Sequence, residues 1–169
     1  HQPGKDDKSV QALYFLSSSM RVFPGDIFLV FRKLLRLVVH GINVKDKYLR
    51  SEFLNRYDFV GGSKLTTLVM TGVSLNVLPA FVFEGAENLI FISLEACRIK
   101  QIDNSAFSGL SKLQTLSLNY NLIRKLDATL KPLKNLRFLS IAGNFIQKIE
   151  ENHFGNLSNL QKVSFTNNI

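Results

Sequence analysis

This chain of 169 residues has little cysteine, no long apolar run and no signal-peptide pattern. It contains a single cysteine, Cys97, so no disulfide bond can form within it. No apolar run reaches the roughly 18 residues needed to span a bilayer, because Lys and Arg residues interrupt the richest stretch, 27–40. The polar start, residues 1–8, has no signal-peptide pattern, so a signal has been removed or was never there. The sequence thus predicts a chain without a transmembrane segment and without internal disulfides.

Catalytic and metal-binding patterns are missing as well. The three histidines, His1, His40 and His153, are far apart in the sequence, and no Cys/His spacing suits zinc. Neither a nucleophile-elbow motif nor a phosphate-binding glycine loop occurs. We therefore predict no enzymatic activity, no cofactor and no metal site.

The charge is strongly basic but dispersed. The net charge is +8 and the pI is near 9.7, which permits a nucleic acid, a heparin-like polyanion or an anionic surface as partner. No dense block of Lys and Arg occurs, which favours a solvated basic surface. The hydrophobic fraction of 46% and the charged fraction of 20% are typical of a folded chain.

A repeated apolar pattern dominates the sequence. It reads L-x-x-L-x-L-x-x-N-x-L, and residues 113–123 and 136–146 match it closely. The copies divide the chain into a polar segment, 1–9, and a solenoid, 10–169, with units 10–33, 34–64, 65–88, 89–112, 113–135, 136–159 and a partial 160–169. A large apolar residue six positions before each following unit supports this register: Phe28, Phe59, Phe83, Phe107, Leu130 and Phe154.

This pattern, followed by x-x-L-P-x-x-x-F-x-x-L, resembles the extracellular type of leucine-rich repeat over residues 10–169. Residues 15–31 are similar in style to arthropod secreted or Toll-like receptor ectodomains. The resemblance implies an α/β solenoid: a leucine-rich-repeat horseshoe with a concave parallel sheet of about seven strands and an irregular or short-helical convex side. It also implies a protein that binds another molecule.

The spacing explains why such units stack. Leu-x-Leu alternation gives a strand with one buried face, which only neighbouring units can cover. We expect Leu94, Leu118 and Ile141 in the core. An Asn at position nine can bond backbone groups that the turn leaves unpaired. Asn121, Asn144 and Asn168 fit this role, while Ser18, Ile42, Val73 and Cys97 replace Asn in earlier units. Cys97 is accordingly interpreted as a buried, inert structural residue.

Unit 34–64 departs from the pattern through extra residues around 46–62. Leu49, Phe53 and Tyr57 are spaced as on one face of a helix, and Gly61-Gly62 would end it. We expect a short amphipathic helix, either covering the core on the convex side or forming a functional insertion.

The outward strand positions give the candidate binding surface. It is mostly neutral, with spread aromatics, while the basic excess falls on turns and the convex side. We expect partner contacts from Tyr14, Arg36, His40, Phe91, Glu95, Asn119, Tyr120 and Phe138. Three of these aromatics, Phe91, Tyr120 and Phe138, are predicted to form one patch.

Two functions remain open. One is an extracellular module, either a receptor ectodomain or a soluble immune or adhesion factor, that binds a protein or an amphipathic ligand through the concave sheet. The alternative is a structural protein that self-assembles or binds matrix polyanions. The sequon Asn156-Leu157-Ser158 is a candidate N-glycosylation site and favours secretion, or the ectodomain of a membrane protein. Since a solenoid end exposes its core, we expect more chain beyond Ile169, or a second copy or partner that covers the C-terminal end.

Overall fold

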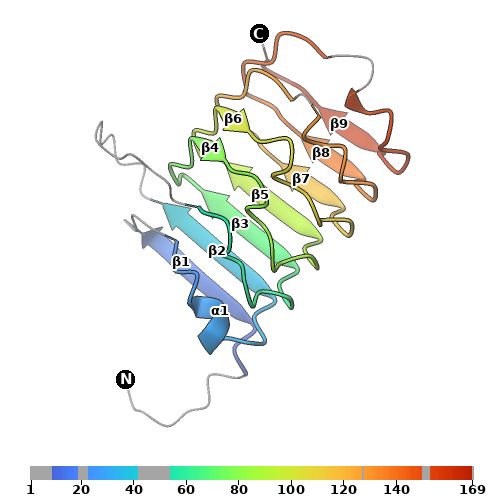
Figure 1. Cartoon of the computed structure of the whole chain (residues 1–169). Coiled ribbons are helices and arrows are strands. Elements are labelled where there is room, and N and C mark those ends of the chain that lie inside the picture. Colours follow the sequence, from blue (N-terminus) through green and yellow to red (C-terminus); the bar gives the residue numbers. More distant parts are fainter. Residues whose placement is uncertain (1–8, 19–22, 42–53, 127, 150–152, 169) are drawn as a thin grey trace.

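The computed structural model describes residues 9–18, 23–41, 54–126, 128–149 and 153–168. They form a solenoid whose strands lie side by side in sequence order (Figure 1). One parallel sheet contains β1 (Ala12–Ser18), β2 (Arg36–Gly41), β3 (Thr67–Thr71), β5 (Phe91–Glu95), β7 (Thr115–Ser117), β8 (Phe138–Ser140) and β9 (Lys162–Ser164). The predicted fold class and its seven concave strands are confirmed.

The strand register agrees with the repeat phase. Leu68 pairs with Ile92, Ile92 with Leu116 and Leu116 with Leu139, so equivalent leucine positions align across the sheet. Their side chains are at most 2% exposed and form one continuous core. Leu94, Leu118 and Ile141 are fully buried, as predicted. Each strand thus covers the apolar face of its neighbours.

The return segments carry little regular structure. A short helix, α1 (Ile27–Val30), lies on the convex side, where β4 (Val77–Leu78) and β6 (Gln101–Ile102) form a two-stranded parallel sheet (Figure 1). The phenylalanines that lie six positions before successive units form a buried column on this side. The ring centroids of Phe28 and Phe59 are 5.7 Å apart, those of Phe59 and Phe83 are 5.5 Å apart, and those of Phe83 and Phe107 are 5.8 Å apart. These buried rings fill the space between successive turns.

Asparagine side chains tie successive turns together. Asn121 Oδ1 accepts hydrogen bonds from the amides of Cys97 and Ile99, each at 3.0 Å. Its Nδ2 donates to the carbonyls of Leu94 (2.7 Å) and Leu118 (2.9 Å). Asn144 and Asn168 make equivalent bonds, with Oδ1 accepting from the amides of Ile123 and Ile146. The predicted role of asparagine at position nine is therefore confirmed.

Cys97 takes the asparagine position in the preceding unit. It is fully buried, and its thiol donates to the carbonyls of Met70 (3.4 Å) and Glu95 (3.2 Å). Burial raises the pKa of the Cys97 thiol to about 12, against a smaller opposing effect of the nearby backbone amides of Val73 and Gly72. The thiol is therefore neutral near pH 7, as the structural interpretation requires.

Position nine of the units, which carries the asparagines that form a ladder along the solenoid, follows a residue that turns the chain sharply. This preceding residue adopts the left-handed conformation in Gly72 (φ 69°), Ala96 (φ 54°), Tyr120 (φ 57°) and Gly143 (φ 65°). A non-glycine residue tolerates this conformation only at some cost in free energy. The sequence pattern carries no mark of this requirement, since glycine, alanine and tyrosine all occupy the position.

The helix expected in the insertion does not include Tyr57. Tyr57 has a φ of 79°, outside the helical region, and its side chain is 58% exposed. Leu54 and Phe59 are the buried residues here, because the described chain runs through turns rather than a helix. Leu49 and Phe53, like residues 1–8 and Ile42, lie outside the described residues.

Candidate recognition surface

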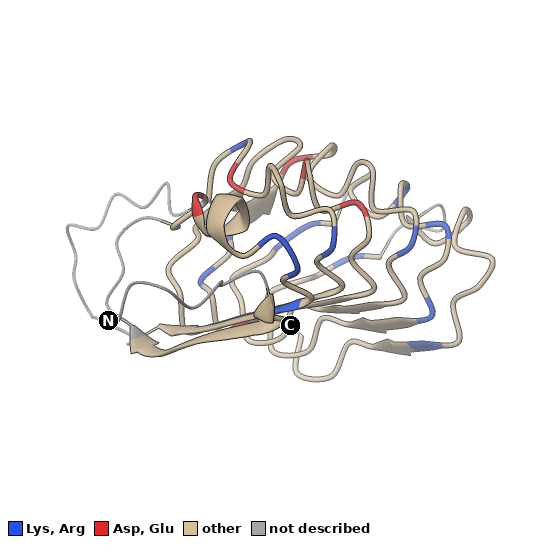
Figure 2. Cartoon of the chain, turned by 90° about the horizontal axis from the view of Figure 1, so that it is seen from below, with Lys and Arg blue, Asp and Glu red and all other residues tan. Residues whose placement is uncertain are grey.

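The outward side chains of the sheet form columns that cross the strands. The first outward column consists of Ala12, Arg36, Thr67, Phe91, Thr115, Phe138 and Lys162, and the second of Tyr14, Val38, Val69, Ser93, Ser117, Ser140 and Ser164. Figure 2 shows the strands mostly tan, with most charged residues on turns and loops. The concave surface is therefore largely uncharged.

Phe91 and Phe138 belong to the first outward column and flank Thr115. Their backbones are roughly 10 Å apart, because each strand step is about 4.8 Å. Phe138 is 41% exposed, and the guanidinium of Arg137 lies 5.8 Å from the centre of its ring. Phe91 is half-buried and Arg36 is exposed two strands away in the same column. This column therefore presents two aromatic rings within reach of one ligand.

Tyr120 lies at the other end of the strands. It follows Thr115 by five positions, which corresponds to roughly 15 Å along the chain. Its ring packs against Gly143, where a Cβ would lie 2.6 Å from Tyr120 Cδ1. Tyr120 is 63% exposed but is not part of the Phe91–Phe138 pair. Phe91 and Phe138 begin their strands, whereas Tyr120 follows the end of β7, so the single patch of all three side chains remains a prediction.

Two predicted contact residues bond within the sheet. Glu95 Oε1 accepts from Ser117 Oγ at 2.6 Å. Asn119 Oδ1 accepts from Ser140 Oγ at 2.7 Å and from the amide of Ala142 at 2.8 Å. Both are half-buried. Their acceptor groups therefore already hold neighbouring strands, which leaves them less free to bind a ligand.

The remaining predicted residues lie near the first strands and on a turn. Tyr14 on β1 is 54% exposed, and its neighbour Leu16, which was not among the predicted contacts, is 66% exposed. His40 is half-buried and pairs with Thr71 across the sheet. Asn156 is exposed in a turn between Phe154 and Leu157. The alternation of strand residues places Leu16 outward, on the same face as Tyr14.

Neither metal-binding clusters nor membrane-spanning helices occur in the described part of the chain. No group of three or more His, Cys, Asp or Glu side chains there could hold a metal ion. No helix among the described residues is both long enough and apolar enough to cross a bilayer. The concave surface offers hydrogen bonding, apolar contact and the exposed cations Arg36 and Lys162.

Comparisons with known proteins agree with this geometry. The family model described as leucine rich repeat matches residues 63–123 and 91–144. No curated protein sequence matches the chain.

Several solved structures share the fold. The LRIM1/APL1C complex is 16% identical with a TM-score of 0.61, and covers 93% of this chain and 24% of that chain. The TLR13–ssRNA13 complex is 24% identical with a TM-score of 0.59, and the match covers 92% of this chain and 24% of that chain. Human 5T4 (Wnt-activated inhibitory factor 1, trophoblast glycoprotein) is 20% identical with a TM-score of 0.75. The match covers 93% of this chain and 59% of that chain. The chain thus spans 24% of the length of the first two matches and 59% of the third.

Proposed function

Because the chain is a leucine-rich-repeat protein, we propose that it is an extracellular binding module. It recognises a protein or an amphipathic ligand through its concave sheet, as part of a receptor ectodomain or as a soluble immune or adhesion factor. One observation carries the proposal: exposed aromatic and apolar side chains stand on a sheet that has few charges. The exposed Asn156 sequon supports an extracellular location.

The physical reason is the preference of interfaces for rigid aromatic anchors. Tyr and Phe bury a large area on binding while losing little conformational entropy. Phe91 and Phe138 form one anchor pair, and Tyr120 forms a second anchor near the ladder turns. Ser93 and Ser117 on the same sheet are buried, so their small side chains project little beyond the sheet. A ligand that contacts both anchors must span several strands, which suits a folded protein or an amphipathic segment.

The test compares capture by two matched variants. In the concave variant, Phe91, Tyr120 and Phe138 become alanine; in the control, Tyr57, Phe81 and Phe145 do. The control residues are also one Tyr and two Phe, exposed by 58%, 39% and 38% and located outside the sheet. Each purified chain is immobilised and exposed to extracellular fluid, and bound proteins are identified by mass spectrometry.

We expect one captured protein to behave as the partner. The unchanged chain and the control should retain it, and the concave variant should lose it. Circular dichroism should show unchanged melting for the concave variant, because none of its three rings belongs to the core cluster. Equal capture by the concave variant would place the binding surface elsewhere. Light scattering adds an independent check: concentration-dependent polymers would favour the structural alternative instead.

A further inference from the structure

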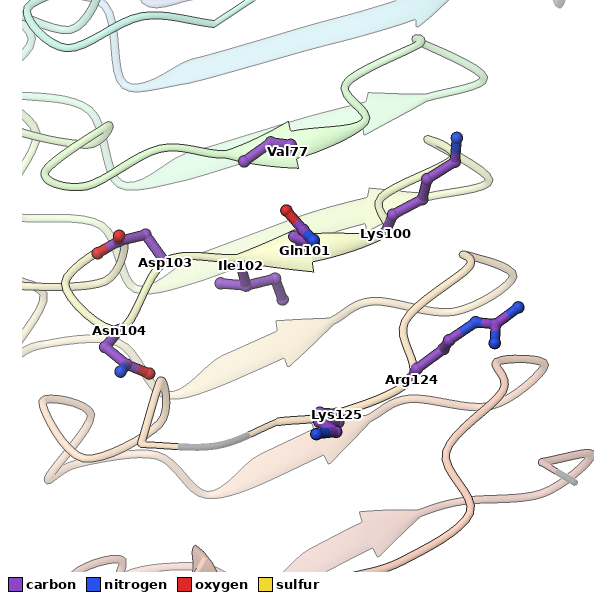
Figure 3. Close-up of a pocket in the computed structure, with 8 residues that line it drawn as sticks. All are labelled: Val77, Lys100, Gln101, Ile102, Asp103, Asn104, Arg124 and Lys125. Carbon is purple, nitrogen blue, oxygen red and sulfur yellow. The ribbon is translucent and has the colours of Figure 1, made fainter.

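A groove opens on the flank of the solenoid, outside the concave sheet. It has a volume of about 560 Å³ and is lined by Val77, Lys100, Gln101, Ile102, Asp103, Asn104, Arg124 and Lys125. Figure 3 shows β6 on one side of it and the chain segment that carries Arg124 and Lys125 on the other. These side chains come from three successive repeat units, so the stacking of the solenoid fixes their relative positions.

The groove exists because the convex sheet stops after two strands. β6 pairs with β4, and the amides of Gln101 and Asp103 donate to the carbonyls of Asn76 and Leu78. By the alternation of a strand, the amide of Ile102 is directed away from β4, toward the groove. In the described residues the sheet has no third strand beside β6. The segment at Arg124 and Lys125 diverges instead, and the space between remains open.

The charge in the groove is mainly positive. Lys100, Arg124 and Lys125 are exposed, whereas Asp103 is its single carboxylate. Figure 3 shows Lys100 and Arg124 near one end of the groove and Asp103 near the other. Asp103 Oδ1 also accepts a hydrogen bond from the amide of Ser105 at 2.7 Å. Within the described part of the chain, none of the three cations forms an ion pair.

An adjoining hollow extends the cationic end. It has a volume of about 350 Å³ and shares Lys100, Gln101 and Arg124 with the groove, while Leu122 and Phe145 add apolar surface. The combined surface therefore has cationic groups, amide donors and one apolar wall. This combination can contact the charged groups of a polymeric anion and the carbon face of its rings.

We propose that this flank groove binds a sulfated oligosaccharide. The sulfate groups bond Lys100, Arg124 and Lys125, the Gln101 and Asn104 side chains bond hydroxyl groups, and the ring faces lie against Leu122 and Phe145. A nucleic acid fits less well, because a run of stacked bases needs several aromatic surfaces beside the cations, and Phe145 is the single aromatic residue among those that line the groove and the hollow. An acidic peptide added as a strand fits less well too, since only Ile102 directs its backbone groups to that side.

The test measures binding of a heparin-derived oligosaccharide to the chain by titration calorimetry at several salt concentrations. The groove variant carries Lys100→Gln, Arg124→Gln and Lys125→Gln. The matched control carries Lys33→Gln, Lys131→Gln and Lys134→Gln, three exposed cations outside the groove, so both variants lower the net charge from +8 by three. All six side chains are exposed, so both variants should keep the fold.

We expect the groove variant to bind about tenfold or more weakly and with a smaller dependence on salt, because fewer counterions are exchanged. The control should lose much less, and a desulfated oligosaccharide should not bind. Equal losses in both variants would overturn the proposal in favour of diffuse attraction to a basic surface. Tighter groove-dependent binding of a single-stranded RNA would overturn the choice of a sulfated sugar. The concave aromatic variant should bind the oligosaccharide normally, which separates this test from that of the proposed function.

Discussion

Replacing Asn121 with alanine is expected to weaken the fold more than any other change in the asparagine ladder. Asn121 is only 2% exposed, so water cannot replace its hydrogen bonds. The substitution leaves the amides of Cys97 and Ile99 without their acceptor and removes the Asn121 donor from the carbonyl of Leu94, while the carbonyl of Leu118 keeps a bond from Asn144 Nδ2. An unsatisfied buried amide costs about 1–3 kcal/mol, so the two amides alone predict a loss of roughly 4 kcal/mol in the free energy of unfolding.

The same substitution at the other ladder positions is expected to cost less stability than at Asn121. Asn144 is equally buried and accepts from the amide of Ile123, so Asn144→Ala should cost roughly 2 kcal/mol. Asn168 is only half-buried, and Asn168→Ala should cost about 1 kcal/mol because water can reach the freed groups. Asn121→Cys should cost less than Asn121→Ala, since the thiol of Cys97 already serves this position one unit earlier.

Urea unfolding followed by circular dichroism gives the global values. Hydrogen exchange measured by NMR gives the local ones, and the amides of Cys97 and Ile99 should exchange faster in Asn121→Ala. The reasoning is refuted if Asn121→Ala costs no more than Asn168→Ala, or if those two amides keep their protection. Either result would mean that packing of the apolar residues, and not the ladder, holds the turns.

Three further changes test other parts of the structure. Leu118→Asp places a charge at a fully buried site and should cost more than about 4 kcal/mol, visible as loss of the cooperative melting transition; native melting would show that the register is wrong. The Cys97 thiol should resist a disulfide reagent at pH 8 until urea is added, because burial raises its pKa to about 12, and stability should fall as pH rises from about 9 toward that value. Gly143→Ala should cost about 1–2 kcal/mol and shift the NMR signals of the Tyr120 ring, because the new Cβ would lie 2.6 Å from Tyr120 Cδ1 in a left-handed residue; unchanged ring signals would contradict this contact.

The strand register was predictable from sequence because its signal is repeated. Each unit buries the same positions, so an error at one unit is corrected by the others. The pairing of Phe91 with Thr115 and of Thr115 with Phe138 follows directly from the aligned leucines. The same holds for the buried phenylalanine column, which marks the same point of each return segment.

Features that occur once were not predictable in this way. The spacing of Leu49, Phe53 and Tyr57 fits a helix, but the backbone of Tyr57 is left-handed because the chain must turn before Phe59 enters the core. The flank groove depends on where the segment after Ile123 diverges from β6, and no residue type marks that point. The sequence did assign the basic residues to the side away from the concave sheet, but it could not show that three of them line one groove.

The two proposed surfaces meet at one buried side chain. Tyr120 on the concave side and Arg124 on the flank lie on either side of Asn121 in the same turn. Asn121 also holds the amide of Ile99, the residue before Lys100 on the other side of the groove. Loosening this turn should therefore move Tyr120, Lys100 and Arg124 together. We expect Asn121→Ala to weaken binding of both the concave partner and the oligosaccharide, although Asn121 itself is too buried to touch either ligand. Calorimetry at a temperature where the variant stays folded measures both affinities, and loss of only one would show that the two surfaces are held independently.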